Sequence, residues 1–429
     1  MIQAVITVFI FGITLYLIFS ERLNRTIAAM AGAVVMVTAG MLGGFYDGTK
    51  ALAAVDFHTL GLLFGMMTLV ALLEPTGFFE VLAIWSARFS QGKPLRLLVL
   101  LGSVTTFLSM FLDNVTTVVL IAPVSIMVCE ILGISPVPIL MSEALLSNTG
   151  GVATLIGDPP NVLIASAAKF SFVDFLTHSL PVVVAAWLAT LALLSYLFRR
   201  ELWVTPANQE VVLGLNPAEA LRDGRTMRRV LLVLGLTILL FFFEEPLQLS
   251  PAHLALGAAA AAMVWTKPDV RQLFARVEWG VLIFFGALFI MVGGLEAAGV
   301  LAAAAALLGN IGNGHPILLG LAVLWVVAGF SAVVDNVPIT IALIPVIQGL
   351  GEAGISISAL WWALAFGAGF GGNATIIGST ANIIVASLSE RTRFPITAAL
   401  WNRRGLPVAL LTCVTASVLF AAFYPLLAK

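Results

Sequence analysis

The sequence predicts an all-α polytopic membrane protein of about ten spans, arranged as two inverted repeats of about five spans each. Three observations support this fold class. The chain of 429 residues is 60% hydrophobic and 10% charged, with a mean hydropathy of +1.07, and a soluble domain cannot bury that much apolar surface. Apolar runs of membrane-spanning length recur along the chain. Two unusual stretches of the first half also return, in altered form, in the second half.

Ten apolar runs are long enough to cross the roughly 30 Å of hydrocarbon in a bilayer. They lie near 2–20, 27–44, 57–75, 137–167, 174–198, 229–244, 251–266, 278–298, 359–390 and 405–427. The first run has no basic segment before it and no small-residue cleavage site, so we interpret it as a retained span. Two further apolar regions, 97–132 and 316–350, carry an Asp-Asn pair near the middle. Each is either two spans or one re-entrant hairpin, and both alternatives enter and leave on the same side.

Basic residues predict which side of the membrane each loop faces, because cytoplasmic loops carry an excess of Lys and Arg. Five loops hold 18 of the 21 Lys and Arg residues, and only Lys50, Lys169 and Lys429 lie outside them. These loops are 21–26, 88–96, 199–229, 267–276 and 391–404. We therefore expect a multi-pass protein of the plasma membrane, with these loops in the cytoplasm and both termini outside.

The one long polar segment, 199–228, is predicted to be a cytoplasmic linker between residues 1–198 and 229–429. Its Asn216-Pro217 pair is typical of the start of a short capped helix. A partner-binding role is the alternative to a plain tether between the two halves.

The halves share their interrupted stretches. GGVATLIGDPPNVLIAS, in the broken helix predicted at 151–168, aligns with GGNATIIGSTANIIVAS, in the broken helix predicted at 372–388. FLDNVTTVVLIAPV aligns with VVDNVPITIALIPV, which pairs Asp113-Asn114 with Asp335-Asn336. Each repeat has an odd number of crossings, so the second must lie upside down relative to the first. Inverted repeats with matching broken helices are typical of secondary transporters, which bind substrate and ions between the halves.

The interruptions are where we expect the chemistry. Non-helical backbone at membrane depth is tolerated only inside protein or against a water-filled cavity, so the two breaks should line such a cavity. A half-helix ending at Gly157 offers carbonyl groups to a cation, and the half beginning near Asn161 offers N–H groups to an anion. The hairpin tips, at 112–117 and 334–339, add side-chain oxygens at the same depth.

The predicted ion- or substrate-binding residues are the polar residues and glycines of the tips and breaks. They are Asp113, Asn114, Thr116, Thr117, Thr154, Gly157, Asp158, Asn161, Asp335, Asn336, Thr375, Gly378, Ser379 and Asn382. An ionised aspartate near the bilayer centre costs roughly 2.5 to 3.5 kcal/mol, so these aspartates should be protonated, paired with a cation, or both. The metal ion considered is sodium, at Asp113/Asn114 and Asp335/Asn336. The alternative role for each aspartate is a helix cap.

Most other polar residues are expected to be structural. Asp56 and Glu278 open spans and are interpreted as first-turn acids favoured by the helix dipole. Glu143 is expected at the membrane interface. Asn148 precedes the first break and either contributes an oxygen to the site or supports helix contacts. The two cysteines, Cys129 and Cys413, lie in apolar runs, so we expect neither a disulfide nor a metal site there.

Several motifs together resemble the ion transporter superfamily, with its citrate-transporter-like domain. These are FLDNVTT, GDPPNV, RVEW followed by FFGALF, DNVPIT with IPV, and LAFGAGFGGNATIIGSTAN. Within the superfamily they look most like the melanosomal P protein and the arsenical pump membrane proteins. Dicarboxylate/sodium symporters and some sodium/proton antiporters are more distant relatives. The resemblance implies alternating access, a scaffold part in each half, a moving part made of hairpins and broken helices, and a homodimer.

One departure from the dicarboxylate branch concerns the tips. That branch carries Ser-Asn-Thr there, which binds the substrate carboxylate. Here Asn114 and Asn336 match, but an aspartate precedes each of them and a valine follows. Two acids would repel a dicarboxylate unless they were protonated or neutralised by a cation.

The leading functional prediction is a secondary active transporter that moves a small inorganic ion with proton or sodium coupling. Arsenite or antimonite efflux is the form that the resemblance suggests, although neither cysteine lies near a break. The alternatives are a sodium/proton antiporter, an anion channel and a dicarboxylate or citrate symporter. We expect membrane lipid, the ion substrate and the coupling ion as partners. No enzyme activity, cofactor or nucleic-acid partner is expected.

Overall fold

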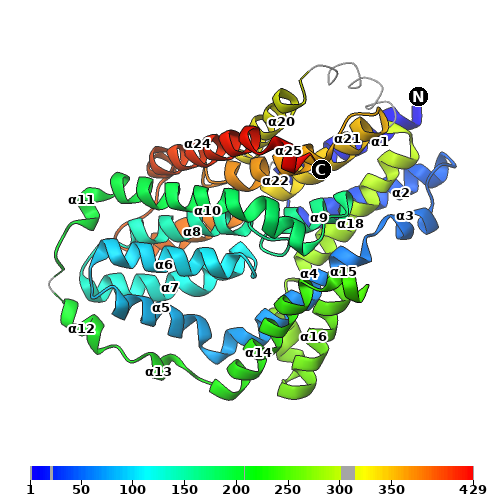
Figure 1. The fold of residues 1–429 in the computed structure, drawn as a ribbon. Coiled ribbons are helices and arrows are strands. Elements are labelled where there is room, and N and C mark those ends of the chain that lie inside the picture. The colour runs from blue at the N-terminus through cyan, green and yellow to red at the C-terminus, as the bar shows by residue number, and fades with distance from the viewer. Residues whose placement is uncertain (1, 20–22, 207, 301–314, 429) are drawn as a thin grey trace.

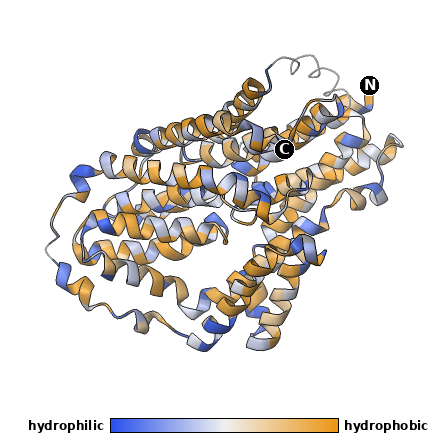
Figure 2. Cartoon of the chain, viewed as in Figure 1, coloured by the Kyte–Doolittle hydropathy of each residue, from blue (hydrophilic) through white to orange (hydrophobic). Residues whose placement is uncertain are grey.

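The computed structural model describes residues 2–19, 23–206, 208–300 and 315–428. Every regular element within these ranges is a helix (Figure 1), which confirms the all-α prediction. Six of the described helices are long and apolar enough to cross a membrane, and five shorter apolar helices accompany them. Hydrophobic residues run along the helices, whereas hydrophilic residues gather mostly at helix ends and along the linker (Figure 2). Arg22 and Lys429, which enter the charge argument, lie outside the described residues.

The first half follows the predicted spans closely. Its helices are α1 (Ile2–Phe19), α2 (Arg25–Leu42), α3 (Gly48–Ala54), α4 (Phe57–Leu73), the 3-10 turn η1 (Glu74–Thr76), α5 (Phe78–Phe89), α6 (Pro94–Ser109), α7 (Asn114–Leu132), α8 (Val137–Gly151), α9 (Pro159–Ala168) and α10 (Phe172–Leu197). Helices α6 and α7 form the first hairpin, and α8 and α9 flank the first break. The short helix α5 has no counterpart among the predicted spans.

The second half repeats this order. Its helices are α14 (Gly224–Phe241), α15 (Glu244–Leu247), α16 (Pro251–Thr266), α17 (Val270–Arg276), α18 (Trp279–Ala297), α20 (Pro316–Ser331), α21 (Asn336–Glu352), α22 (Ser358–Gly371), α23 (Thr380–Glu390), α24 (Ala398–Ala422) and α25 (Tyr424–Leu427). Helices α20 and α21 form the second hairpin, and α22 and α23 flank the second break. The depth of the hairpins in a membrane and the inverted orientation of the second half stay predictions.

The first break begins earlier than the sequence predicts. Helix α8 ends at Gly151 rather than at Gly157, and the chain is non-helical until α9 begins at Pro159. Gly157 folds back onto α8, and a Cβ there would come within 2.6 Å of the Gly151 carbonyl oxygen. The two prolines form the first turn of α9 instead of the break. Proline fits there because the N–H groups of a first turn have no partner within the helix, so the missing N–H of proline costs no hydrogen bond.

Helix contacts divide the chain into two groups. In Figure 1 most of one group lies to the left, while its helices α9 and α21 reach the other group on the right. The α4/α18 group contains α1 to α4 with α14, α16, α17 and α18, and the hairpin group contains α5 to α10 with α20 to α24. Within the hairpin group, each broken helix packs on the other half, α9 against α21 and α22, and α23 against α7 and α8. The two groups meet mainly where α4 contacts α9 and α18 contacts α21. The two hairpins and both broken helices, which the resemblance assigns to the moving part, all lie in the hairpin group. Which group moves stays a prediction.

The linker 199–228 lies against the first half. It contains α11 (Arg199–Leu202), α12 (Gln209–Gly214) and α13 (Pro217–Ala220), and α13 packs on α5. Asn216 accepts the Ala218 N–H, so the predicted capped helix is confirmed. The Arg222 N–H donates to the Thr76 carbonyl oxygen at 2.9 Å, at the joint between α4 and α5. The linker therefore contacts the point where the chain passes from one group to the other.

Candidate ion-binding site

A small cavity lies where the two hairpin tips and the two breaks meet. Six predicted site residues line it: Asp113, Asn114, Asp158, Asp335, Asn336 and Ser379. Its volume is about 30 Å³, which is enough to hold at least one water molecule. We call it the central cavity. It has room for a water molecule or a bare monovalent ion.

Acidic residues dominate the central cavity. Asp113, Asp158, Asp335 and Glu278 line it, and Arg25 is the one basic residue among the described lining residues. Taking several ionised carboxylates out of water is costly unless each has a partner of opposite charge or carries a proton. The cavity therefore suits cations and protons better than it suits anions.

The first hairpin tip presents Asp113 as the cap of α7. The Asp113 carboxylate accepts the Thr116 N–H at 3.1 Å and the Thr116 hydroxyl at 3.3 Å. Glu278 precedes α18 but makes no cap bond, and it lines the central cavity together with Asp113. Both acids also line an adjoining cavity of about 150 Å³, which extends along α4 to the ion pair of Glu74 and Arg276.

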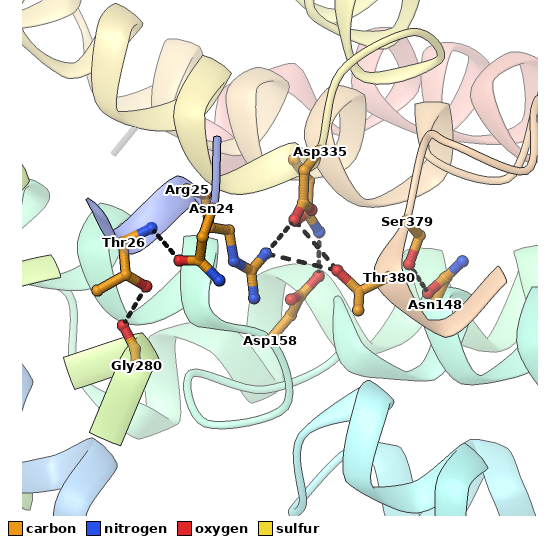
Figure 3. A network of polar contacts seen from close by, with 10 residues as sticks. Asn24, Arg25, Thr26, Asn148, Asp158, Gly280, Asp335, Ser379 and Thr380 are labelled. Atoms are coloured by element: carbon orange, nitrogen blue, oxygen red, sulfur yellow. Dashed lines mark hydrogen bonds and ion pairs between the residues drawn. The ribbon is translucent and has the colours of Figure 1, made fainter. Parts of the chain in front are cut away.

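The second hairpin tip is arranged differently (Figure 3). The Arg25 Nη1 atom lies 2.6 Å from Asp335 Oδ2, and the Thr380 hydroxyl donates to the same oxygen at 3.3 Å. Asp335 makes no side-chain cap bond to α21. The amide of Asn336 donates to Asp158 Oδ2 at 2.7 Å, which joins the second tip to the first break.

Asn148, on α8, connects the first tip to the second break. Its Nδ2 atom donates to Asn373 Oδ1 and Asn382 Oδ1, both at 3.0 Å. Its Oδ1 atom accepts from Asn114 Nδ2 at 3.1 Å and from the Ser379 hydroxyl at 2.9 Å. Two donated and two accepted bonds use the full capacity of a side-chain amide. All five residues are buried, so this network is shielded from water.

Two predicted asparagines hold the breaks in shape rather than facing the cavity. Asn161 Nδ2 donates to the carbonyl oxygens of Gly151 and Thr154, at 2.9 and 2.8 Å. Asn382 Nδ2 makes the matching bonds in the second half, to Gly372 at 2.8 Å and to Thr375 at 2.9 Å. The two breaks therefore share one local geometry.

Other predicted residues also brace the backbone. The Thr154 hydroxyl donates to the Met110 carbonyl oxygen, and the Thr375 hydroxyl donates to that of Ala332, so each break is tied to its own hairpin tip. The residues with such bracing roles are Thr117, Thr154, Gly157, Asn161, Thr375, Gly378 and Asn382. Thr116 lines the adjoining cavity.

Three residues of the site are absent from the predicted set. In the sequence, Arg25 is interpreted as a loop charge and Glu278 as a first-turn acid, and Asn148 has two open roles, in the site or in helix contacts. Asp56, the repeat counterpart of Glu278, does cap its helix, because it accepts the N–H groups of His58 and Thr59. Nothing in the sequence around Glu278 indicates that it leaves its helix uncapped, unlike Asp56. The one sequence signal at Arg25 is its position at the start of an apolar run.

Glu143 is fully buried among protein side chains on α8. Its predicted place at the membrane interface stays a prediction. The Ser125 hydroxyl donates to its Oε1 atom, and its Oε2 atom has no hydrogen-bond partner among the described residues. The apolar sequence around Glu143 continues on both sides, so α8 keeps it inside the hairpin group.

Comparison with known proteins places the chain among membrane transporters. Residues 15–367 match the family model described as citrate transporter. A 46 kDa membrane protein of Mycobacterium leprae is 38% identical over 97% of this chain and 98% of its own length. An uncharacterized transporter of Mycobacterium tuberculosis is 37% identical over 98% of each chain.

Two further comparisons are more distant. The human P protein is 31% identical over 92% of this chain, which spans 57% of the P protein. The crystal structure of the YdaH transporter of Alcanivorax borkumensis, described as having an unusual topology, superposes with a TM-score of 0.62. That alignment covers 99% of this chain and 98% of the transporter at 16% identity, so it supports the fold alone.

Proposed function

This chain belongs to the citrate transporter family, and from that premise we propose that it is a secondary active transporter that works by alternating access. Its coupling proton or sodium ion binds at the hairpin tips, on Asp113 and Asp335. Asn114 and Asn336 complete the two tips. The division into two helix groups supports this mechanism. The groups meet mainly where α4 contacts α9 and α18 contacts α21, and such groups can shift relative to one another around a site between them.

The observation that carries the proposal is the excess of carboxyl groups over guanidinium in the central cavity. A carboxylate held away from water must pair with a cation or take up a proton, and exchange between these two states is what coupling requires. The geometry therefore favours sodium/proton antiport. A citrate or dicarboxylate ion is disfavoured, because it would meet four acids and one arginine in the central cavity.

Arsenite or antimonite efflux is the second candidate. The acid form of arsenite is uncharged at neutral pH and carries hydroxyl groups, so carboxylates would not repel it. The amides of Asn114 and Asn336 and the hydroxyl of Ser379 line the central cavity and offer hydrogen bonds to such a molecule. Cys129 and Cys413 are buried elsewhere, so this candidate does not involve thiol capture.

We also propose the arrangement in the membrane from the placement of basic residues. The protein lies in the plasma membrane, with the linker 199–228 in the cytoplasm and both termini outside. From the resemblance, we also propose that it forms a homodimer. The adjoining cavity, which reaches Arg276 in a predicted cytoplasmic loop, then opens toward the cytoplasm.

The test is proton movement in proteoliposomes that carry an internal pH dye and are challenged in turn with sodium, lithium, arsenite and citrate. A saturable response to sodium or lithium alone is the expected result. A response to arsenite alone would transfer the proposal to the second candidate, and one to citrate would overturn the argument from charge. Linear flux that ignores the proton and sodium gradients would show an anion channel. Empty liposomes are the control.

A further inference from the structure

The ion pair at the second hairpin tip crosses the boundary between the two helix groups. Arg25 is the first residue of α2, in the α4/α18 group, and Asp335 is the tip residue of the hairpin group. Thr26, beside Arg25, donates its hydroxyl to the Gly280 carbonyl oxygen at 2.9 Å, so this end of α2 is tied to α18 (Figure 3). Any movement of the hairpin group relative to α18 must therefore stretch or break the Arg25–Asp335 contact.

The ion pair is also open to exchange. The side chains of Arg25 and Asp335 keep 36% and 24% of their surface accessible. Both line a cavity of about 380 Å³, which no α4 residue lines, and Thr380 and Val334 line it as well. Partly exposed ion pairs contribute little net stability, so a competing cation can displace one partner.

Arg25 stands where a bound cation would stand. Its Nη1 atom is 2.6 Å from Asp335 Oδ2, and it also lies 3.5 Å from the Thr380 hydroxyl oxygen. A carboxylate oxygen and a hydroxyl oxygen are both ligands that hard cations prefer. The guanidinium also lies over the ring of Phe284, 5.7 Å from its centroid, which stabilises the positive charge at this position.

We propose that Arg25 is a tethered cation that competes with the transported cation for Asp335. This inference rests on the proposed function and adds a residue of the same site that regulates cation binding. While Arg25 occupies Asp335, the second tip is neutral and held to the α4/α18 group. When a proton or sodium ion binds Asp335, Arg25 is released and the hairpin group is free to move. Cation binding at Asp335 and movement of the hairpin group are thereby linked.

The first experiment compares Arg25→Gln with wild type in the sodium-driven proton assay. Removing an internal competitor lowers the half-saturating sodium concentration, and we expect a fall of about tenfold, equivalent to about 1.4 kcal/mol. Arg25→Lys keeps a tethered cation and should stay within about twofold of wild type. Arg229→Gln is the matched control, because Arg229 lies over Trp265 at the same 5.7 Å and faces no described carboxylate partner. An unchanged or raised half-saturating concentration in Arg25→Gln overturns the proposal.

A second experiment keeps Arg25 in place and so does not depend on the folding of an Arg25 variant. In the variant Val334→Cys, position 334 is half-buried in the 380 Å³ cavity, and the reaction of the new thiol with a maleimide is timed with and without sodium. The native cysteines are buried, so the background is low. Sodium should change the rate severalfold through release of Arg25, and Asp335→Asn should abolish this effect. A rate that ignores sodium contradicts the proposal.

The two experiments separate the two levels of inference. Absence of sodium-driven proton movement in wild type would overturn the proposed function itself. A wild type that exchanges sodium for protons, with an Arg25→Gln variant of unchanged sodium dependence, would overturn only the role of Arg25.

Discussion

The two hairpin tips carry the same Asp-Asn pair and use it differently. Asp113 caps α7 through Thr116 and shares its cavity with a second acid, Glu278. Asp335 makes no side-chain cap bond and pairs with Arg25. Both Glu278 and Arg25 come from the α4/α18 group. The two tips share the Asp-Asn pair but differ in the residue that the α4/α18 group places beside it. Among the described residues, the acid of the second tip forms an ion pair and the acids of the first tip do not.

The largest expected effect is at Asp113. Asp113→Asn keeps a good capping residue but removes the charge, so coupled transport should fall to background, at least about 100-fold, or about 2.7 kcal/mol. Initial rates in proteoliposomes measure this. Asp47→Asn is the matched control, since Asp47 caps α3 by accepting the Lys50 N–H and lies away from the central cavity. Normal coupled transport in Asp113→Asn would reduce Asp113 to a helix cap.

Asn148 should show the next largest effect, on stability. The tips differ here as well, because Asn114 bonds to Asn148 whereas Asn336 bonds to Asp158. Asn148→Leu leaves several buried polar groups without partners, so the free energy of unfolding should fall by about 3 kcal/mol. Thermal unfolding in detergent measures the change. Asn208→Ala, which removes an exposed bond from the linker to α7, should shift the midpoint little. Equal shifts would show that the amide network does not hold the hairpin group together.

Glu278 and Asp56 form a matched pair for a smaller effect. Glu278→Gln removes one of the two acids at the first tip and should raise the half-saturating sodium concentration about threefold to tenfold, or about 0.7 to 1.4 kcal/mol. Asp56→Ala removes a cap and should lower stability by about 1 kcal/mol while leaving sodium dependence unchanged. Sodium titrations and thermal unfolding of both variants decide this. The reverse pattern would mean that the first tip holds its cation without Glu278.

The smallest effect is expected at His253. The Ser250 hydroxyl oxygen lies 2.7 Å from His253 Nδ1 and 3.3 Å from that of His58, in the part of the second half that corresponds to the start of α2. Neither histidine lines the central or the adjoining cavity. His253→Gln should therefore change the transport rate less than about twofold, or about 0.4 kcal/mol. A large defect would show that the first tip has a basic partner in another conformation.

Much of the fold could be predicted because polar breaks stand out in apolar runs. The Asp-Asn tips and the glycine-rich breaks are visible in the sequence, and the repeat pairs them. The site could be predicted only in part. Arg25 and Glu278 reach the central cavity through contacts between α2, α18 and the tips, and no local pattern encodes such contacts. The bracing role of Asn161 is equally hidden, since an asparagine beside a break can face either the cavity or the backbone.

The position of Asn148 bears on how the two halves descended from one ancestor. Asn148 meets Asn373, and the repeat matches these positions to Gly369 and Val152. That second pair also meets, since a Cβ at Gly369 would lie 2.1 Å from Val152 Cγ2. One copy of a duplicated contact is now polar, and the other is apolar and depends on glycine. Two copies of the first half would press an asparagine against valine at both places, and two copies of the second would leave an asparagine facing glycine. At this contact each half complements the other, and two copies of either half would lose the match.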